Sequence, residues 1–165
     1  MTIRQATADD LDAVKAIVRD VVQEMGASGN FQWDDAYPDE ARFRLDLDNG
    51  ALYVADDEGG VAGFAAVDED EPDGYGGVPW RGEGGALVLH RLAVAPQRRG
   101  QGVASRLEAF VCALALSRGI RHLKSDTYST NLAMQAFFVG AGYRKVGEMA
   151  YRGKPLPFFC FEKVL

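Results

Sequence analysis

The chain passes from a strand-like run into a helix-like run at residues 97–104, which read Gln97-Arg98-Arg99-Gly100-Gln101-Gly102-Val103-Ala104. The residues Leu87–Val94 before it have the apolar character of a strand, and a helical pattern follows it as far as Ser117. A glycine turn between a strand and a helix points free backbone N–H groups and a helix N-terminus at an anion. Its two glycines allow close approach, and its two arginines add positive charge. The stretch therefore predicts a site for a phosphorylated cofactor, with the pyrophosphate on the N–H groups of Arg99–Ala104.

Three interpretations of this turn compete. A P-loop requires a lysine after the last glycine, and Val103 stands there instead. A dinucleotide-binding fingerprint requires a third small residue, which Ser105 supplies, but such a turn normally opens its domain. The turn at residues 97–104 comes after more than half of the chain, so the sequence gives a dinucleotide site only weak support. A purely structural strand-to-helix turn stays open as well.

The residues just before the turn make the pattern more specific. Leu92-Ala93-Val94-Ala95-Pro96 supplies a Val-x-Pro-like step at the end of the strand. A Gln/Arg-x-x-Gly-x-Gly/Ala loop in that place resembles the coenzyme A-binding motif of the GNAT superfamily of acetyl-CoA-dependent N-acyltransferases. A second matching element is Asn131, followed by Phe137-Phe138 and Gly142-Tyr143. The motif match covers about a third of the chain, and the N-terminal part agrees only in the order of its elements.

Hydrophobic periodicity and turn residues predict the remaining elements. We expect strands at residues 1–5, 51–55, 61–67, 87–94, 120–126, 143–151 and 158–164, and helices at 11–25, 38–49, 103–117 and from 131 to 140. Residues 68–85, which are acidic and rich in glycine, are predicted to form a long loop. The fold class is α/β, with a mixed, splayed central sheet of about seven strands flanked by about four helices, as the resemblance to the GNAT fold implies.

Composition sets the broad class. With 165 residues, 47% of them hydrophobic, the chain suits one N-acetyltransferase domain over residues 1–165. No apolar run is long enough for a membrane span, and the first residues do not resemble a signal peptide. Cys112 and Cys160 form no C-x-x-C pair, and the histidines are scattered, so we expect no metal and a reduced, cytoplasmic setting. No basic groove studded with aromatic residues indicates nucleic-acid binding.

Charge is distributed unevenly along the chain. Residues 1–90 carry 6 Lys and Arg against 20 Asp and Glu, whereas residues 91–165 carry 12 against 4. The basic C-terminal part suits an anionic cofactor such as acetyl-CoA. The acidic N-terminal part suits attraction of a cationic amine, but acidic loops that only solvate the surface give the same pattern.

The resemblance implies the chemistry and most of the site. An amine of a small molecule would attack the acetyl thioester directly, without a covalent enzyme intermediate, and the cofactor's pantetheine arm would pair with the open edge of the strand that ends at Val94. Neither cysteine is therefore expected to be a nucleophile. Because many members of the superfamily are dimers, a homodimer is a further expectation. The residues expected at the cofactor are Leu92, Ala93, Val94, Arg98, Arg99, Gly100, Gln101, Gly102, Val103, Ala104, Asn131 and Phe138.

The catalytic residues are less well determined. Many members of the superfamily have tyrosine where this chain has Phe138, which has no proton to give to the leaving thiolate. Tyr128, Tyr143 or Tyr151 would replace it, or the thiolate would leave unassisted, since thiols are fairly acidic. His90 is the expected base, with Glu83 and ordered water as alternatives. The loss of the usual acid also keeps open an inactive acetyl-CoA-binding or sensor module.

Aromatic residues mark the expected acceptor side. The segment Phe31–Pro38 joins the first two helices, and in the superfamily this segment commonly walls the acceptor pocket. Trp33 and Tyr37 within it, and Trp80 in the long loop, are the predicted acceptor-binding residues. Aromatic faces attract a cationic amine, although the same side chains can simply anchor a loop to the core. Together with the acidic N-terminal part, they predict a small cationic or amino-acid-like acceptor.

Overall fold

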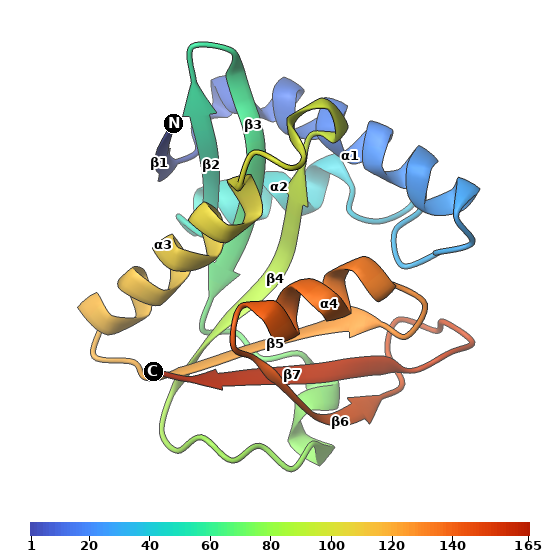
Figure 1. The fold of residues 1–165 in the computed structure, drawn as a ribbon, viewed down its shortest axis with the longest axis vertical. Coiled ribbons are helices and arrows are strands. Elements are labelled where there is room, and N and C mark those ends of the chain that lie inside the picture. The colour runs from blue at the N-terminus through green and yellow to red at the C-terminus, as the bar shows by residue number, and fades with distance from the viewer.

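The computed structural model describes residues 1–165 and contains one seven-stranded sheet with the strand order β1-β2-β3-β4-β5-β7-β6 (Figure 1). All neighbours are antiparallel except β4 and β5, which are parallel. The predicted fold class is therefore confirmed. The strands are β1 Thr2–Gln5, β2 Leu52–Asp57, β3 Gly60–Asp68, β4 Ala86–Val94, β5 His122–Tyr128, β6 Arg144–Met149 and β7 Phe158–Val164. The helices are α1 Leu11–Ala27, α2 Glu40–Asp48, α3 Val103–Ser117 and α4 Leu132–Gly140.

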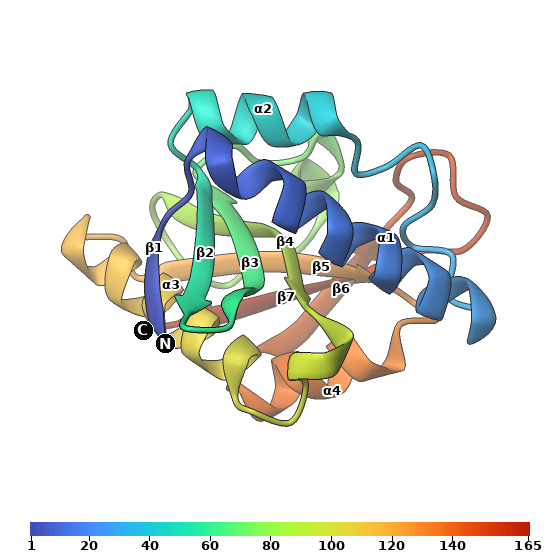
Figure 2. The same cartoon turned by 90° about the horizontal axis from the view of Figure 1, so that it is seen from above.

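Helices cover both faces of the sheet (Figure 2). On one face, α1 and α2 bury a cluster around Val14, Phe43 and Phe64. On the other face, α3 and α4 bury a second cluster that includes Leu107 and Phe138. Helices α1 and α3 turn a periodic apolar stripe inward, which is the reason that the apolar periodicity located them in the sequence, whereas α4 is apolar almost throughout and leaves Leu132 and Val139 exposed. None of the helices has the length and apolar character needed to cross a lipid bilayer.

The sheet opens in its middle, between β4 and β5. The parallel pairing runs only from Ala86 opposite His122 to Leu89 opposite Ser125. On its other edge β4 stays paired with β3 as far as Val94, with one irregularity that leaves His90 as an extra residue. Such a bulge bends and twists its strand. Beyond Leu89, β4 therefore follows β3 and α1 while β5 follows β7, and the β4 edge has no strand beside it (Figure 1).

The acidic loop predicted between β3 and β4 packs against the sheet. It contains a short 3-10 turn at Asp73–Gly77, and Tyr75 is fully buried beneath it against β5 and β7. The indole Nε1 of Trp80 donates to the backbone carbonyl of Tyr75 at 2.9 Å. The loop thus covers the part of the sheet that α1 and α2 leave open.

Two predicted boundaries differ from the structure for local reasons. The second helix begins at Glu40 rather than at Pro38, because Asp39 is its N-cap and accepts the Arg42 N–H at 2.9 Å. Strand β5 begins at His122 rather than at residue 120. The N–H of Ile120 closes the end of α3 by donating to the carbonyl of Ala115, with Gly119 at φ +73°.

Candidate active site

The glycine loop between β4 and α3 presents a row of free donors. Gly100 and Gly102 have φ of +73° and +75°, which residues with a Cβ rarely adopt. The backbone N–H groups of residues 100–105 have no acceptor within the protein, since the first helical bond runs from the Arg106 N–H to the Gly102 carbonyl. Six unpaired donors at the positive end of a 15-residue helix form an arrangement that suits an anion.

The surroundings of the loop are compatible with a diphosphate. A Cβ built at either glycine meets no atom within 4 Å, so the space in front of the loop is open. Arg98 contacts Asp57 and Gln101, and Arg99 contacts Glu24, so both guanidinium groups are held beside the loop. The backbone N–H groups are therefore the main donors of the loop, and the two arginine side chains, which already have carboxylate partners, add to them.

A cleft, here called the strand cleft, lies where β4 and β5 diverge. It is lined by Leu89–Leu92 of β4, by Ser125 and Asp126 of β5, and by Asn131, Met134 and Phe138 at α4. Leu92, Asn131 and Phe138, three of the residues expected at the cofactor, thus line the same cleft. Asn131 caps α4 by accepting the Met134 N–H at 3.1 Å, which was one of its two predicted roles.

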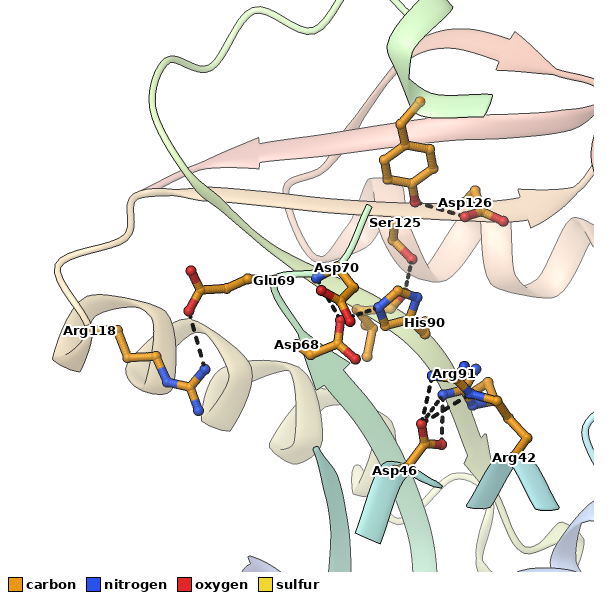
Figure 3. A network of polar contacts seen from close by, with 12 residues as sticks. Arg42, Asp46, Asp68, Glu69, Asp70, His90, Arg91, Arg118, Ser125 and Asp126 are labelled. Atoms are coloured by element: carbon orange, nitrogen blue, oxygen red, sulfur yellow. Dashed lines mark hydrogen bonds and ion pairs between the residues drawn. The ribbon is translucent and has the colours of Figure 1, made fainter. Parts of the chain in front are cut away.

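His90 lies on the bulge of β4 and reaches the strand cleft. Its Nε2 is 2.6 Å from Oδ1 of Asp68, the last residue of β3 (Figure 3). Burial is the largest single influence and would raise the pKa of Asp68, but the hydrogen bond and charge of His90, the Asp70 N–H and the charge of Arg42 together hold that pKa below its usual value. An ionised Asp68 accepts the Nε2 proton, so the basic nitrogen of a neutral His90 is Nδ1, which has no partner in the protein and is not buried.

Asp126 lies on the β5 wall of the strand cleft, at the point where β5 leaves β4 (Figure 3). The hydroxyl of Tyr75, from the acidic loop, donates to Asp126 Oδ2 at 2.7 Å. Burial raises the pKa of the Asp126 carboxyl above its usual value, and the Tyr75 hydrogen bond partly opposes that rise. The cleft therefore has a titratable group on each strand.

A second hollow, here called the side pocket, joins the strand cleft and shares Gln32, Trp33, His90, Arg91 and Asp126 with it. Its own walls come from the α1–α2 loop, from α2, from the acidic loop before β4, and from the segment that runs from the β6–β7 loop into β7. They are Tyr37, Arg42, Asp70, Glu71, Pro72, Tyr151, Arg152 and Phe158. Trp33 also stacks on Phe64 with centroids 6.4 Å apart, so this tryptophan both anchors its loop and lines the site.

A buried ion pair forms one wall of the side pocket. Asp46, on α2, is 0% exposed and accepts both Nη2 of Arg91, at 2.6 and 2.7 Å, and Nη2 of Arg42, at 2.9 Å (Figure 3). Arg91 also donates to the Tyr37 hydroxyl at 2.8 Å, and its Nε is buried without a partner. Two arginines share one carboxylate, so this wall keeps an excess of positive charge.

The α1–α2 loop connects the two halves of the sheet across the strand cleft. The side-chain oxygen of Gln32 accepts three hydrogen bonds from the C-terminal half. The donors are the Thr127 hydroxyl at 2.9 Å, the Tyr128 N–H at 3.2 Å and the Asn131 amide at 2.8 Å. This contact fixes the position of Trp33, the next residue in the chain.

Several predicted site residues lie away from both hollows. Tyr128 is buried against Phe158, and its hydroxyl accepts the Leu156 N–H. Tyr143 is buried beside Phe138 with its hydroxyl unpartnered, and burial raises its pKa well above the usual value. Trp80 packs between Tyr75 and Lys124 instead of lining the side pocket. Glu83 is exposed on the loop before β4.

The cysteines also lie outside the hollows. Burial raises the pKa of the Cys112 thiol to about 11 and that of the Cys160 thiol to about 12. Both are free thiols, and both stay protonated near neutral pH.

Several residues that the structure brings to the site were not among those predicted from the sequence. Asp126 and Arg91 lie on strands that read as buried, and a charged residue in such a run was the available signal. Gln32 and Arg152 lie in loops, where no local pattern reveals a partner more than 90 residues away. Tyr151, considered as an acid, does line the side pocket, and burial raises its pKa.

Comparisons with known proteins identify the family of the chain. The model of the acetyltransferase (GNAT) family matches residues 18–143. N-acetyltransferase 8F1 of Rattus norvegicus is 28% identical over 102 residues, which are 61% of this chain and 42% of that protein. The chain thus matches less than half the length of this curated relative.

Solved structures resemble the whole chain. Ribosomal-protein-alanine N-acetyltransferase from Brucella melitensis is 25% identical, with a TM-score of 0.75 and all of both chains covered. A GNAT-family acetyltransferase from Streptococcus agalactiae shares the fold, with a TM-score of 0.83 at 24% identity over 99% of this chain and 95% of that one. Since the family model spans well over half of the sequence, this protein belongs to the GNAT family of acetyltransferases.

Proposed function

We propose that this protein transfers an acetyl group from acetyl-CoA to a primary amine of a small molecule by direct attack. The observation that carries the proposal is the continuity of three features along β4. The free N–H groups of residues 100–105 follow this strand, its open edge lines the strand cleft, and His90 lies where that cleft meets the side pocket. A long cofactor would enter from the loop side and an amine from the side pocket.

The loop and the strand edge would hold the cofactor. The N–H groups of residues 100–105 would bind its diphosphate, with Arg98 and Arg99 beside them. The unpaired backbone of β4 beyond Leu89 would pair with the pantetheine arm and supply an N–H to the thioester oxygen. Bound acetyl-CoA supplies an activated acetyl group.

His90 and Asp126 would prepare the amine. An ammonium ion must lose a proton before its nitrogen can attack, and Nδ1 of His90 is a free acceptor oriented by Asp68. Asp126, on the opposite wall, would hold the ammonium in place by charge. Attack would form the amide C–N bond as the C–S bond breaks, and the proton that the nitrogen then loses would pass through water to the departing thiolate.

The leaving group needs no acid from Phe138. That side chain is buried at the cleft and has no proton to give, and Tyr143 beside it is sealed from the cleft. A thiol has a pKa of about 8.5, so the thiolate is a tolerable leaving group near neutral pH. We therefore expect deprotonation and attack of the amine, and not departure of the thiolate, to limit the rate.

The test is calorimetric titration with acetyl-CoA, with NAD and ATP as controls, followed by an amine panel that detects released thiol. Gly102→Ala places a Cβ before the free N–H groups, and we expect binding to weaken by about tenfold or more, or ~1.4 kcal/mol. Gly119→Ala is the matched control, because Gly119 also has positive φ and open space around it but lies at the other end of α3. Equal loss in both variants would reject the phosphate role of the loop.

The same experiment separates the alternatives. Binding of acetyl-CoA with no thiol release from any amine would indicate a sensor module rather than an enzyme. A preference for NAD or ATP over acetyl-CoA would indicate a nucleotide-binding domain and overturn the proposal.

A further inference from the structure

The side pocket contains one cation that the protein does not neutralise. Arg152, on the loop between β6 and β7, is half-buried and forms no hydrogen bond or ion pair with another side chain. Its guanidinium carbon lies 3.0 Å from the centre of the Tyr37 ring and 6.0 Å from that of Tyr151. Burial lowers the pKa of Arg152, because a half-buried guanidinium is less well hydrated than one in water.

Every other basic side chain in or beside the pocket has a carboxylate partner. Arg42 and Arg91 bind Asp46, and His90 binds Asp68. Just outside the pocket, Lys154 binds Asp34 and Lys124 binds Glu71. Against this background the free guanidinium of Arg152 is an exception, and burying an unpaired charge is costly.

The Arg91 wall adds to the positive charge of the same region. Arg42 and Arg91 share the single carboxylate of Asp46, and the buried Nε of Arg91 has no acceptor. Tyr37 links this wall to Arg152, because its hydroxyl accepts from Arg91 while its ring lies under the Arg152 guanidinium. An aromatic face and neighbouring side chains thus fix the orientation of a planar cation that faces the pocket.

We propose that Arg152 binds the carboxylate of the acceptor, so that the preferred acceptors are amino acids with a free carboxylate. This inference rests on the proposed function and names the substrate class of the same pocket. A guanidinium donates two parallel hydrogen bonds to a carboxylate, and a desolvated pair of this kind is strong and directional. By holding the carboxylate of the amino acid, Arg152 would orient the amine of the same molecule.

The pocket also has groups that suit the amine of a zwitterion. Asp126 and the base His90 lie where the side pocket meets the strand cleft, and they suit the amine that must approach the thioester. Asp70 and Glu71 also line the pocket, and Glu71 is paired with Lys124. Trp33, Tyr151 and Phe158 supply apolar surface for the acceptor side chain. A free guanidinium and a carboxylate that line the same pocket therefore favour an amino acid over a simple diamine and over a peptide N-terminus, whose first residue has no free α-carboxylate.

Matched ligands test the carboxylate directly. Each amino acid in a panel is compared with its α-carboxamide, which keeps the amine and the side chain but loses the negative charge. We expect the wild type to favour the acid over the amide in kcat/KM by about tenfold or more. Arg152→Gln should abolish that preference by raising KM for the acids, with little change for the amides. Arg152→Lys should keep part of the preference.

A binding arm without catalysis keeps this inference separate from the proposed function. Binding of the same amino acids and amides is measured by calorimetry, with no acetyl-CoA present, for wild type, Arg152→Gln and Arg121→Gln. Arg121 is exposed and donates only to the carbonyl of Leu165, so it is the control. Selective binding of acids that only the Arg152 variant loses supports the carboxylate site, even if no acetyl transfer is detected. Equal binding of acids and amides, or equal loss in both variants, overturns it.

Discussion

At the residue scale, His90 and Asp126 have different expected roles, and kinetics can separate them. His90→Gln removes the free acceptor Nδ1, so we expect kcat to fall by about 10²- to 10⁴-fold with little change in acetyl-CoA affinity. Asp126→Asn removes a charge that would hold the ammonium, so KM for the amine should rise more than kcat falls. Initial rates with acetyl-CoA and the amine varied separately give these values.

The pH profile provides an independent control for this assignment. If His90 takes the proton, the fall of kcat/KM on the acid side should disappear in His90→Gln and persist in Asp126→Asn. Tyr75→Phe should raise the pKa of Asp126 further, because the Tyr75 hydrogen bond now lowers it. An acid limb that persists in His90→Gln and moves upward in Tyr75→Phe would instead make Asp126 the base.

At the element scale, local sequence patterns located the glycine loop and the helices but not the site that they frame. Gly100 and Gly102 are defined by their own backbone torsions, and Asn131 caps an N–H only three residues away. The local sequence pattern was therefore enough to predict them. The opening between β4 and β5 depends on the bulge at His90, the one residue of β4 that has no partner on β3. The position of such a bulge is set by the pairing of strands that are distant in the sequence, so a local pattern does not reveal it. Tyr128, Tyr143 and Trp80 looked available in the sequence because aromatic residues carry no local sign of the core they enter.

The junction of β1 with the first helix gives a prediction about stability against pH. Arg4 binds Asp10 at 2.7 Å and Asp56 at 2.8 Å, and Asp10 also accepts the Thr7 N–H. The hydrogen bond from Arg4 lowers the pKa of Asp10 from 3.8 to about 2. The folded state thus binds fewer protons than the unfolded state between these values, so this stabilisation is complete above about pH 4 and is lost as the pH falls towards 2.

The variant Asp10→Asn tests this junction. Because the Arg4 side chain is 37% exposed, solvent screens the pair, and we expect a loss of about 1–2 kcal/mol in the free energy of unfolding at pH 7. The difference from wild type should shrink steadily between pH 4 and pH 2 in urea unfolding. Asp12→Asn removes an exposed carboxylate that contacts Lys15 and should change stability by less than about 0.5 kcal/mol. If the difference in unfolding free energy between the variant and wild type stays constant with pH, Asp10 acts through its hydrogen bond from the Thr7 N–H and not through its charge.

At the scale of the whole molecule, the open sheet consists of two halves that share the candidate site. The N-terminal half supplies His90 and the phosphate loop, and the C-terminal half supplies Asp126, α4 and the Arg152 loop. A short stretch of β4–β5 pairing, the α1–α2 loop and the Tyr75–Asp126 hydrogen bond join them near the cleft. A ligand that touches both halves should therefore stabilise the whole protein, by about 2.7 kcal/mol at a concentration of 100 times its Kd.

Gln32 is the side chain on which this connection depends most. Gln32→Ala leaves the Thr127 hydroxyl, the Tyr128 N–H and the Asn131 amide without their acceptor. Unsatisfied donors of this kind cost about 1–3 kcal/mol, so Tm should fall by several degrees. Because Trp33 and Tyr37 follow on the same loop, KM for the amine should rise as well, whereas acetyl-CoA binding at the glycine loop should change little.

Gln135→Ala is the matched control for this change. Gln135 also carries an amide in the same region, but it donates a single hydrogen bond to the Ser129 carbonyl at 2.9 Å. Scanning calorimetry with and without acetyl-CoA, together with amine kinetics, compares the two variants. If Gln32→Ala lowers Tm and leaves KM for the amine unchanged, the loop only stabilises the fold. If KM rises in step with the loss of stability, while Gln135→Ala changes neither, the same three hydrogen bonds hold the two halves together and shape the pocket between them.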